Sequence, residues 1–238
     1  MSGRGPESPG TETNGRRPWL LAIDTATSRV VVPAGSPDGQ PLGATTWIAG
    51  RSHGEQLLPA IGRLHGEANL RRSRIAAVIV GTGPGAFTGL RVGIATAKAL
   101  AHELAVPLVG VSTAEALLTA SADAGLSADV LLLPAGPNDH LVIATGETPR
   151  LVAGPVDPRL AAAGTTIAVD LDGRAEPAAL ERGETARHGL AAALLRLGAA
   201  RIGQGQLDDL ATIVPDYVSL PRGVAAETGE VAWSRDPR

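Results

Sequence analysis

The sequence predicts an α/β protein of two lobes, and three observations support this prediction. Three short apolar strands joined by turns open the chain, a glycine-rich turn then links a strand to a long helix, and a second series of strands and a helix follows. The 238 residues are 44% hydrophobic but only 2% aromatic, so the cores must consist of Ala, Val, Leu and Ile. This length suffices for one large domain or two small lobes with real cores.

The first part of the chain reads as a tail followed by an antiparallel meander. Residues 1–17 are Gly, Ser, Pro, Thr and charged residues with almost nothing to bury, and we expect a disordered tail. Apolar runs at 19–23, 29–32 and 45–49 predict three strands. A strong turn signal, Ser-Pro-Asp-Gly at 36–39, separates the second strand from the third.

A helix is predicted over 52–67. The Ser52 hydroxyl can cap its first turn while Glu55, three residues later, reaches back, which is the pattern of a capping box. The side chains of Leu57, Leu58 and Ile61 then recur at helical spacing and form an apolar stripe.

The most informative segment is 79–101, where a strand over 75–80 meets a helix over 88–104. Four residues that favour a sharp turn lie between them: Gly81, Gly83, Pro84 and Gly85. Small residues then recur every four positions on one helix face: Gly89, Gly93, Ala97 and Ala101. Because two glycines inside a helix cost about 1 kcal/mol each relative to alanine, this face is expected to receive another backbone at close range.

A glycine turn before a helix is also typical of phosphate binding, since exposed amides and the helix dipole favour anions. Gly81-x-Gly83-x-x-Ala86 imitates a dinucleotide fingerprint, but a Rossmann unit needs an acidic residue at the end of the next strand. That strand, 107–111, is followed by Ser112 and Thr113. The Gly-Lys-Ser/Thr of a P-loop is missing as well. A nucleotide turn and a purely structural turn both remain open on spacing alone.

The second half is less regular. Strands are predicted at 130–133, 141–145 and 166–170, and a helix rich in Ala and Leu at 185–197. Helical structure is expected to continue over 196–202 and 208–210 before the final segment.

Composition narrows the function classes. The chain has no cysteine, which excludes disulfides, thiolate metal sites and a cysteine nucleophile. A net charge of −3, with no stretch that interleaves basic and aromatic residues, gives no signature of direct nucleic-acid binding. The apolar run at 19–23 is far too short for a signal peptide or a membrane helix, so an intracellular, cytoplasmic protein without membrane contact is expected.

Four stretches in one order resemble the TsaB (YeaZ-type) family. The longest is GPGAFTGLRVGIATAKALAHELAVPLVGVSTAEAL at 83–117, and the others are LAIDTAT at 21–27, RSHGEQLLP at 51–59 and VPDYV at 214–218. The resemblance covers roughly 20–120 strongly and 210–235 moderately, whereas the middle of the chain is poorly matched. A match of this length is far more specific than any short motif within it.

The resemblance implies the actin-like, Hsp70-like and sugar-kinase-like (ribonuclease H-like) α/β fold, with a degenerate second lobe. We expect a tail at 1–17, an N-terminal lobe of order β-β-β-α-β-α at 18–118, and a C-terminal lobe at 119–238 whose last segment packs back on the N-terminal lobe. The family members are relatives of the enzyme TsaD and of glycoprotease-like proteins, and they are non-catalytic partners of TsaD in the synthesis of threonylcarbamoyladenosine at position 37 of tRNA. The implied partners are a TsaD-type catalytic subunit, a TsaE-type ATPase and, without TsaD, a second copy of the chain, with tRNA met only indirectly.

Two acidic turns matter for nucleotide binding in this superfamily. The first is here Asp24-Thr25, which either faces a nucleotide or merely ties its turn through hydrogen bonds to the backbone. At the second turn, Pro-Ala-Gly-Pro at 134–137 replaces the Asp-Ala-Arg common in relatives. This loss argues against an independent nucleotide site, and no cofactor is expected.

Catalytic residues of the relative are replaced. TsaD carries His-x-Glu-Gly-His, whose imidazoles bind a metal, where this chain has Thr113 and Leu117. Leu cannot ligate a metal and a Thr hydroxyl is a poor substitute for imidazole. None of the five histidines has a second one at i+4, and they are interpreted as surface or capping residues: His53, His65, His102, His140 and His188. Ser52, Ser112 and Ser121 lack the Gly-x-Ser-x-Gly elbow of a hydrolase. We therefore expect no catalytic residues and no metal.

Binding of a partner protein then remains as the expected role, and the two N-terminal helices are expected to provide the binding surface. Arg91 either pairs across a partner interface or with an acid of its own lobe. The predicted partner-binding residues are Ser52, His53, Glu55, Leu57, Leu58, Ile61, Gly89, Arg91, Gly93, Ala97 and Ala101. In the alternative reading the small-residue face packs on the protein's own sheet. A free-standing sugar-kinase-like or glycoprotease-like enzyme is the alternative function, although a kinase would need the second acidic turn and a protease a nucleophile or metal ligands.

Overall fold

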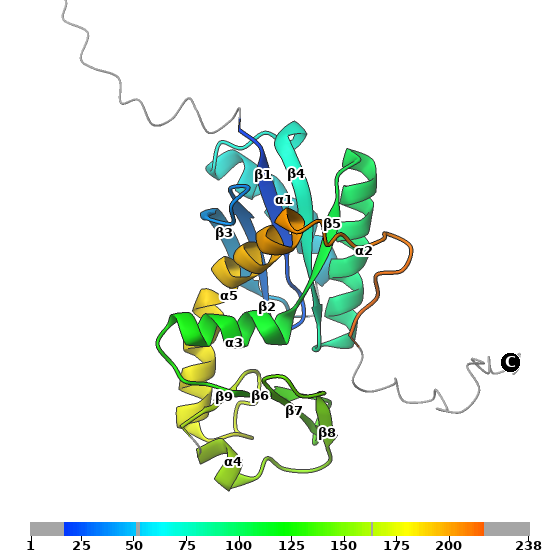
Figure 1. The fold of residues 1–238 in the computed structure, drawn as a ribbon. Coiled ribbons are helices and arrows are strands. Elements are labelled where there is room, and N and C mark those ends of the chain that lie inside the picture. Colours follow the sequence, from blue (N-terminus) through cyan, green and yellow to red (C-terminus); the bar gives the residue numbers. More distant parts are fainter. Residues whose placement is uncertain (1–16, 51–52, 163, 217–238) are drawn as a thin grey trace, which may run out of the picture.

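The computed structural model describes residues 17–50, 53–162 and 164–216. Residues 1–16 of the predicted tail and the final segment 217–238 lie outside the described residues. The upper lobe in Figure 1 contains a five-stranded sheet in the order β3-β2-β1-β4-β5, and the lower lobe a four-stranded sheet in the order β8-β7-β6-β9. The predicted two-lobed α/β fold class is confirmed.

The first sheet follows from five apolar runs. It comprises β1 (Trp19–Ile23), β2 (Arg29–Gly35), β3 (Pro41–Ile48), β4 (Ile75–Gly83) and β5 (Leu108–Ser112). β1 pairs antiparallel with β2, and β2 antiparallel with β3, which gives the predicted meander. β1 is parallel to β4, and β4 is parallel to β5. The strands were therefore predicted well, although β3 begins four residues before the expected start.

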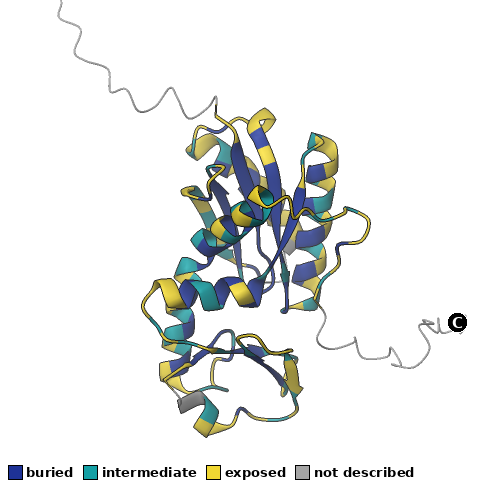
Figure 2. Ribbon diagram, in the orientation of Figure 1, coloured by how far each residue is buried: buried dark blue, intermediate teal, exposed yellow. Residues whose placement is uncertain are grey.

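Helices cover both faces of this sheet because β1 and β4 are apolar on both sides. Leu21 and Ile23 face α1 (His53–Glu67) and α2 (Phe87–Leu104), whereas Leu20 and Ala22 face α3 (Thr113–Asp123) and α5 (Pro177–Gly203). Successive strand residues point to opposite faces, so a strand buried on both sides reads as one continuous apolar run. Figure 2 shows β1, β4 and β5 as mostly buried and the outward helix surfaces as exposed. The edge strand β3 has only exposed and intermediate residues.

The smaller lobe carries β6 (Val130–Pro134), β7 (His140–Ala144), β8 (Arg150–Val152), α4 (Pro158–Ala162) and β9 (Thr166–Ala168). β6 pairs antiparallel with β7 and parallel with β9, as β1 does with β2 and β4. The second lobe thus repeats a reduced version of the first.

Two predictions for the second half need correction, and one helix was missed. The helix expected at 185–197 is one helix of 27 residues, α5, which begins at Pro177. The expected helix at 208–210 is absent from the described chain; instead Asp208 pairs with Leu108, and its carboxylate accepts a hydrogen bond of 2.8 Å from the Gly110 N–H. α3, between the lobes in Figure 1, was not predicted from the sequence.

One apolar core continues through both lobes. It contains Val111 of the first sheet and Leu131 of the second, and between them Leu117 of α3 and Leu190 of α5. α5 contacts strands of both sheets, namely β2 and β9. The lobes are therefore packed on shared helices rather than joined by a linker alone.

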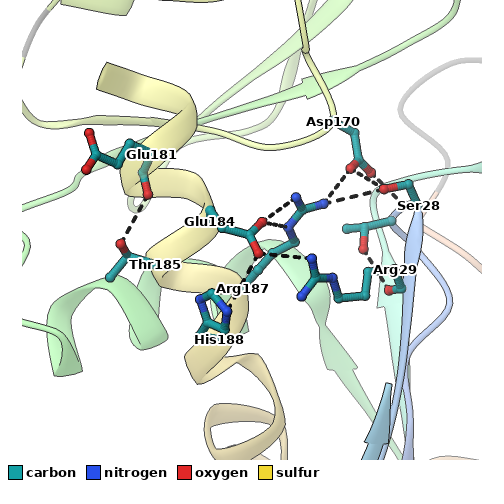
Figure 3. A network of polar contacts seen from close by, with 9 residues as sticks. Ser28, Arg29, Asp170, Glu181, Glu184, Thr185, Arg187 and His188 are labelled. Atoms are coloured by element: carbon teal, nitrogen blue, oxygen red, sulfur yellow. Dashed lines mark hydrogen bonds and ion pairs between the residues drawn. The ribbon is translucent and has the colours of Figure 1, made fainter. Parts of the chain in front are cut away.

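Polar contacts reinforce this joint on one side (Figure 3). The Arg187 guanidinium on α5 donates to Asp170 Oδ1 at 2.7 Å and to Glu184 Oε2 at 2.8 Å. Arg29 of β2 contacts the other oxygen of Glu184 at 3.0 Å. Burial raises the pKa of Glu184, but the hydrogen bond and charge of Arg187, together with Arg29 and His188, lower it below its ordinary value. Glu184 therefore keeps its charge within the network.

Candidate functional site

The carboxylate of Asp24, at the end of β1, lies at the centre of a buried cluster. Its Oδ2 accepts a hydrogen bond of 2.6 Å from the Thr113 hydroxyl, and its Oδ1 accepts one of 3.0 Å from the Ala26 N–H. The Thr113 hydroxyl in turn accepts the Gly83 N–H at 3.1 Å. Both Asp24 and Thr113 have no exposed surface. Burial raises the pKa of Asp24, and the hydrogen bonds from Thr113 and Ala26 offset this rise in part.

Thr25 is equally enclosed. Its hydroxyl donates a 2.7 Å hydrogen bond to the Gly89 carbonyl in the first turn of α2, and the residue is 1% exposed. Neither the Asp24 nor the Thr25 side chain reaches the surface, so the geometry gives no support to the predicted nucleotide-facing role. Both tie the turn after β1 to neighbouring elements, which was the alternative left open by the sequence.

The glycine turn packs against the same region. A Cβ on Gly81 would overlap the Asp24 carboxylate, and one on Gly85 would overlap the Ala26 carbonyl. The Ala86 N–H donates to that carbonyl at 2.7 Å, and Gly83 and Pro84 are buried. These glycines thus allow two turns of the chain to approach closely, and the structural interpretation of the turn is the one that the geometry supports.

The small-residue face of α2 points inward. All four of its members are buried, and a Cβ on Gly93 would overlap the Thr25 hydroxyl. Gly89, Gly93, Ala97 and Ala101, predicted to bind a partner, thus have the packing of the alternative left open by the sequence, in which this face lies on the protein's own sheet. The close backbone approach exists, but the neighbour is the protein's own β1 turn and sheet.

The opposite face of α2 is exposed and also small. Successive residues of an α-helix are about 100° apart, so positions two further along lie on nearly the opposite side. Ala95 and Ala99 are exposed there, two residues after Gly93 and Ala97. At the start of the helix, the exposed Arg91 has its guanidinium carbon 3.8 Å from the centre of the Phe87 ring.

A groove of about 970 Å³ runs between this face and α1. Leu58, 58% exposed, and Leu100 form apolar walls, while His65, Arg72 and Glu103 supply polar atoms. The groove is lined by Leu58, Ile61, Gly62, His65, Arg72, Ala95, Thr96, Ala99, Leu100 and Glu103.

The other predicted residues of α1 divide between core and surface. Leu57 and Ile61 are buried against the sheet, so Leu57 is a core residue rather than a contact residue, whereas Ile61 also borders the groove. Glu55 is exposed. Ser52 lies outside the described residues, as does the side chain of His53, and the expected capping box is outside them too.

The residues that resemble metal positions in the catalytic relative are structural here. Thr113 holds Asp24, and Leu117 is fully buried in the core shared by the lobes. Throughout 17–50, 53–162 and 164–216, three or more His, Cys, Asp or Glu side chains never gather closely enough to hold a metal ion. Within the same ranges, no helix is both long and apolar enough to cross a membrane.

A second hollow of about 1110 Å³ separates the lobes. Its walls are α3 on one side and the turn between β7 and β8 on the other. Three carboxylates line it, from Glu115, Glu147 and Asp216, and the lining side chains within the described chain include no Lys, Arg or His. Such a cleft is unsuited to the phosphates of a free nucleotide.

Comparison with known proteins identifies relatives of this chain. The family model for TsaD, tRNA N6-adenosine threonylcarbamoyltransferase, matches residues 43–228. An uncharacterized protein of Mycobacterium leprae is 41% identical over 101 residues, which cover 41% of this chain and 28% of that protein. The tRNA threonylcarbamoyladenosine biosynthesis protein TsaB of Escherichia coli is 37% identical over 94 residues, 40% of each chain. The chain thus matches less than half the length of these curated relatives.

A solved structure extends the likeness to the whole fold. The crystal structure of an uncharacterized Pseudomonas aeruginosa protein with similarity to peptidase YEAZ superposes with a TM-score of 0.63. It is 25% identical in sequence, and the match covers 85% of this chain and all of the other. The structural likeness therefore extends well beyond the two fifths of the chain that match the curated relatives in sequence.

Proposed function

Since this chain belongs to the family of the tRNA N6-adenosine threonylcarbamoyltransferase TsaD, we propose that it is a non-catalytic subunit of that tRNA modification. It binds and supports a TsaD-type catalytic subunit during synthesis of N6-threonylcarbamoyladenosine at position 37 of tRNA. A TsaE-type ATPase is the third component, and the chain forms a homodimer when the catalytic subunit is absent. tRNA is contacted through the catalytic subunit, in the cytoplasm.

The lack of catalysis is supported by what Asp24, Thr113 and Leu117 do. A catalytic acid or metal ligand must reach substrate, yet all three side chains are enclosed in the core. The Thr113 hydroxyl donates a hydrogen bond to the Asp24 carboxylate, and both side chains accept hydrogen bonds from neighbouring backbone N–H groups. These residues stabilise the meeting point of β1, β4 and α3.

The observation that carries the proposal is the α1–α2 groove. Leu58 is among the most exposed large apolar side chains of the described chain, and the alanines Ala95 and Ala99 flank it with little side-chain bulk. Small residues on a helix surface allow a second helix to approach closely. A pair of amphipathic helices from a TsaD-type subunit is the occupant that fits this surface, since two exposed helices with a shared apolar groove can form a four-helix contact.

The polar rim of the groove supplies specificity. Arg72 and His65 lie on the side of α1, and Glu103 lies on α2. Opposed charges at the edge of an interface mainly set orientation and association rate, while desolvated apolar residues near the centre carry most of the affinity. Leu58 is therefore the expected anchor.

The test is binding of the full chain to its cognate TsaD-type subunit, measured by calorimetry and analytical ultracentrifugation. Leu58→Asp should weaken the complex about tenfold or more, because it places a charge on a desolvated surface. Ala99→Arg should act similarly by filling the groove. Both residues are on the surface, so the melting temperature should stay within a few degrees of wild type.

Leu151→Asp is the matched control, since Leu151 is 47% exposed but lies on β8 of the other lobe. It should bind as wild type does. Undiminished binding by both groove variants would contradict the proposed surface. Peptide hydrolysis or sugar phosphorylation by the isolated chain would instead favour the free-standing enzyme and contradict the proposed function.

A further inference from the structure

The cleft between the lobes has an apolar wall and an acidic rim. Leu118 on α3 and Ile143 on β7 contribute to the wall, and Pro149 closes the far side. Glu115 and Glu147 are exposed on opposite sides, the first in α3 and the second in the turn after β7. Three carboxylates, with no Lys, Arg or His among the described lining residues, give this cleft a negative charge that favours a cationic group.

The last described residues of the chain lie at the edge of this cleft. The final described segment runs alongside α2 in Figure 1 and ends at the level of α3. Asp216, its last residue, lines the cleft and is held there by two hydrogen bonds to Thr82. The Asp216 N–H donates to the Thr82 carbonyl at 2.8 Å, and the Thr82 hydroxyl donates to Asp216 Oδ2 at 2.6 Å. These bonds fix the point from which residues 217–238 continue.

The sequence that follows is complementary to the cleft. Residues 217–222 read Tyr-Val-Ser-Leu-Pro-Arg, and Pro221 disfavours a helix. In an extended chain Val218, Leu220 and Arg222 point to the same side, which presents two apolar groups followed by a cation. Six extended residues span about 20 Å, enough to cross a cleft of this size.

We propose that residues 217–222 bind in the cleft between the lobes of their own chain, with Val218 and Leu220 against the wall at Leu118 and with Arg222 between Glu115 and Glu147. A segment anchored at Asp216 has a high effective concentration at the cleft, so modest contacts suffice to hold it. This inference is independent of the partner-binding groove, which lies on α1 and α2.

Disulfide trapping tests the placement directly, because the full chain has no cysteine. The variant Thr119→Cys/Leu220→Cys places one thiol in the cleft and one on the segment. With oxidised glutathione as oxidant, the disulfide should form within one chain, about tenfold faster than in a control that shares the same tether. The control is Thr88→Cys/Leu220→Cys, since Thr88 is exposed and close to Pro84 in sequence but does not line the cleft.

The charge contribution is tested in the same background. Adding Arg222→Glu should slow disulfide formation, and adding Arg222→Lys should preserve it, because only the positive charge is required between the two carboxylates. Ala122→Cys, at an exposed position that also lines the cleft, replaces Thr119→Cys if that half-buried site tolerates substitution poorly. Equal rates in the cleft variant and the control would overturn the proposal. A disulfide between two chains would also overturn it, and would assign the cleft to a second copy.

Discussion

Asp170, just after β9, accepts two hydrogen bonds from Ser28, which lies 142 positions earlier in the turn before β2. The Ser28 N–H donates to Asp170 Oδ2 at 2.6 Å, and its hydroxyl donates to Oδ1 at 2.5 Å. Asp170 has a left-handed backbone, with φ of 58°, and its side chain is 14% exposed. Because Arg187 binds the same carboxylate, one acidic residue joins a turn of each lobe to the shared helix α5.

Asp170→Asn should destabilise the protein by about 1–3 kcal/mol, because it weakens the contact with a partly buried guanidinium and replaces one acceptor with a donor. Because Asn tolerates the left-handed backbone, any loss of stability reports the lost charge and acceptor rather than backbone strain. Urea denaturation measures the effect. Asp123→Asn breaks the more exposed pair with Arg196, with side chains 46% and 51% exposed, and should change stability by less than about 0.5 kcal/mol. Equal effects of the two variants would refute the special role of Asp170.

Gly93→Leu should destabilise the fold rather than affect a partner alone. Any Cβ at this position overlaps the Thr25 hydroxyl, so a leucine must displace α2 from the sheet, at a cost of about 1–3 kcal/mol or more. Thermal melts followed by circular dichroism measure this cost. Gly66→Ala in α1 is the control, since a Cβ there would meet none of the described atoms within 4 Å. It should gain about 0.5–1 kcal/mol from higher helix propensity. A Gly93→Leu protein with wild-type stability would show that α2 does not pack as described.

The raised pKa of Asp24 predicts a pH dependence of stability. The unfolded chain titrates this group near its ordinary value of 3.8, whereas the folded chain holds the proton to higher pH. Between these two pKa values the folded state binds more protons, so stability falls as pH rises through this window. The free energy of unfolding of wild type relative to Asp24→Asn should therefore decrease as pH rises above about 4, and then level off. Denaturation curves across this range measure it. A difference that grows with pH would contradict the assignment.

Residues 1–17 should be dispensable. Their composition offers too little apolar surface to offset an ordering cost of about 1–2 kcal/mol per residue. A protein that begins at Pro18 should keep its melting temperature and its affinity for a TsaD-type subunit. A loss of several degrees would show instead that the tail docks on the folded protein.

The sequence was informative where local pattern and family resemblance agreed. The first strand was predicted over the residues that form it, because a run of apolar residues at 19–23 is followed by the polar turn at Asp24. The resemblance to TsaB proteins is confirmed by the Escherichia coli relative of that name. α3 was missed because Thr113–Asp123 contains mainly small residues, whose burial comes from contact with α5 rather than from an amphipathic pattern.

The orientation of α2 could not be obtained from spacing. Small residues occur both at Gly93 and Ala97 and, on the opposite side, at Ala95 and Ala99. Only the three-dimensional contact between Thr25 and α2 decides which pair faces the sheet. The same limit applies to Asp208, which looked helical locally but pairs with β5, about one hundred positions earlier in the chain.

Because α5 covers an apolar face of the first sheet, the order of synthesis leaves that face open for a time. Leu20, Ile79 and Val109 leave the ribosome well before Leu190 and Leu194, the α5 residues of the same core. At translation rates of about 5–20 residues per second, this apolar face of the sheet stays exposed for several seconds before α5 has been synthesised. The nascent N-terminal lobe is thus a natural client for chaperones that bind exposed aliphatic surface, and its escape from aggregation depends on a helix encoded near the end of the described chain.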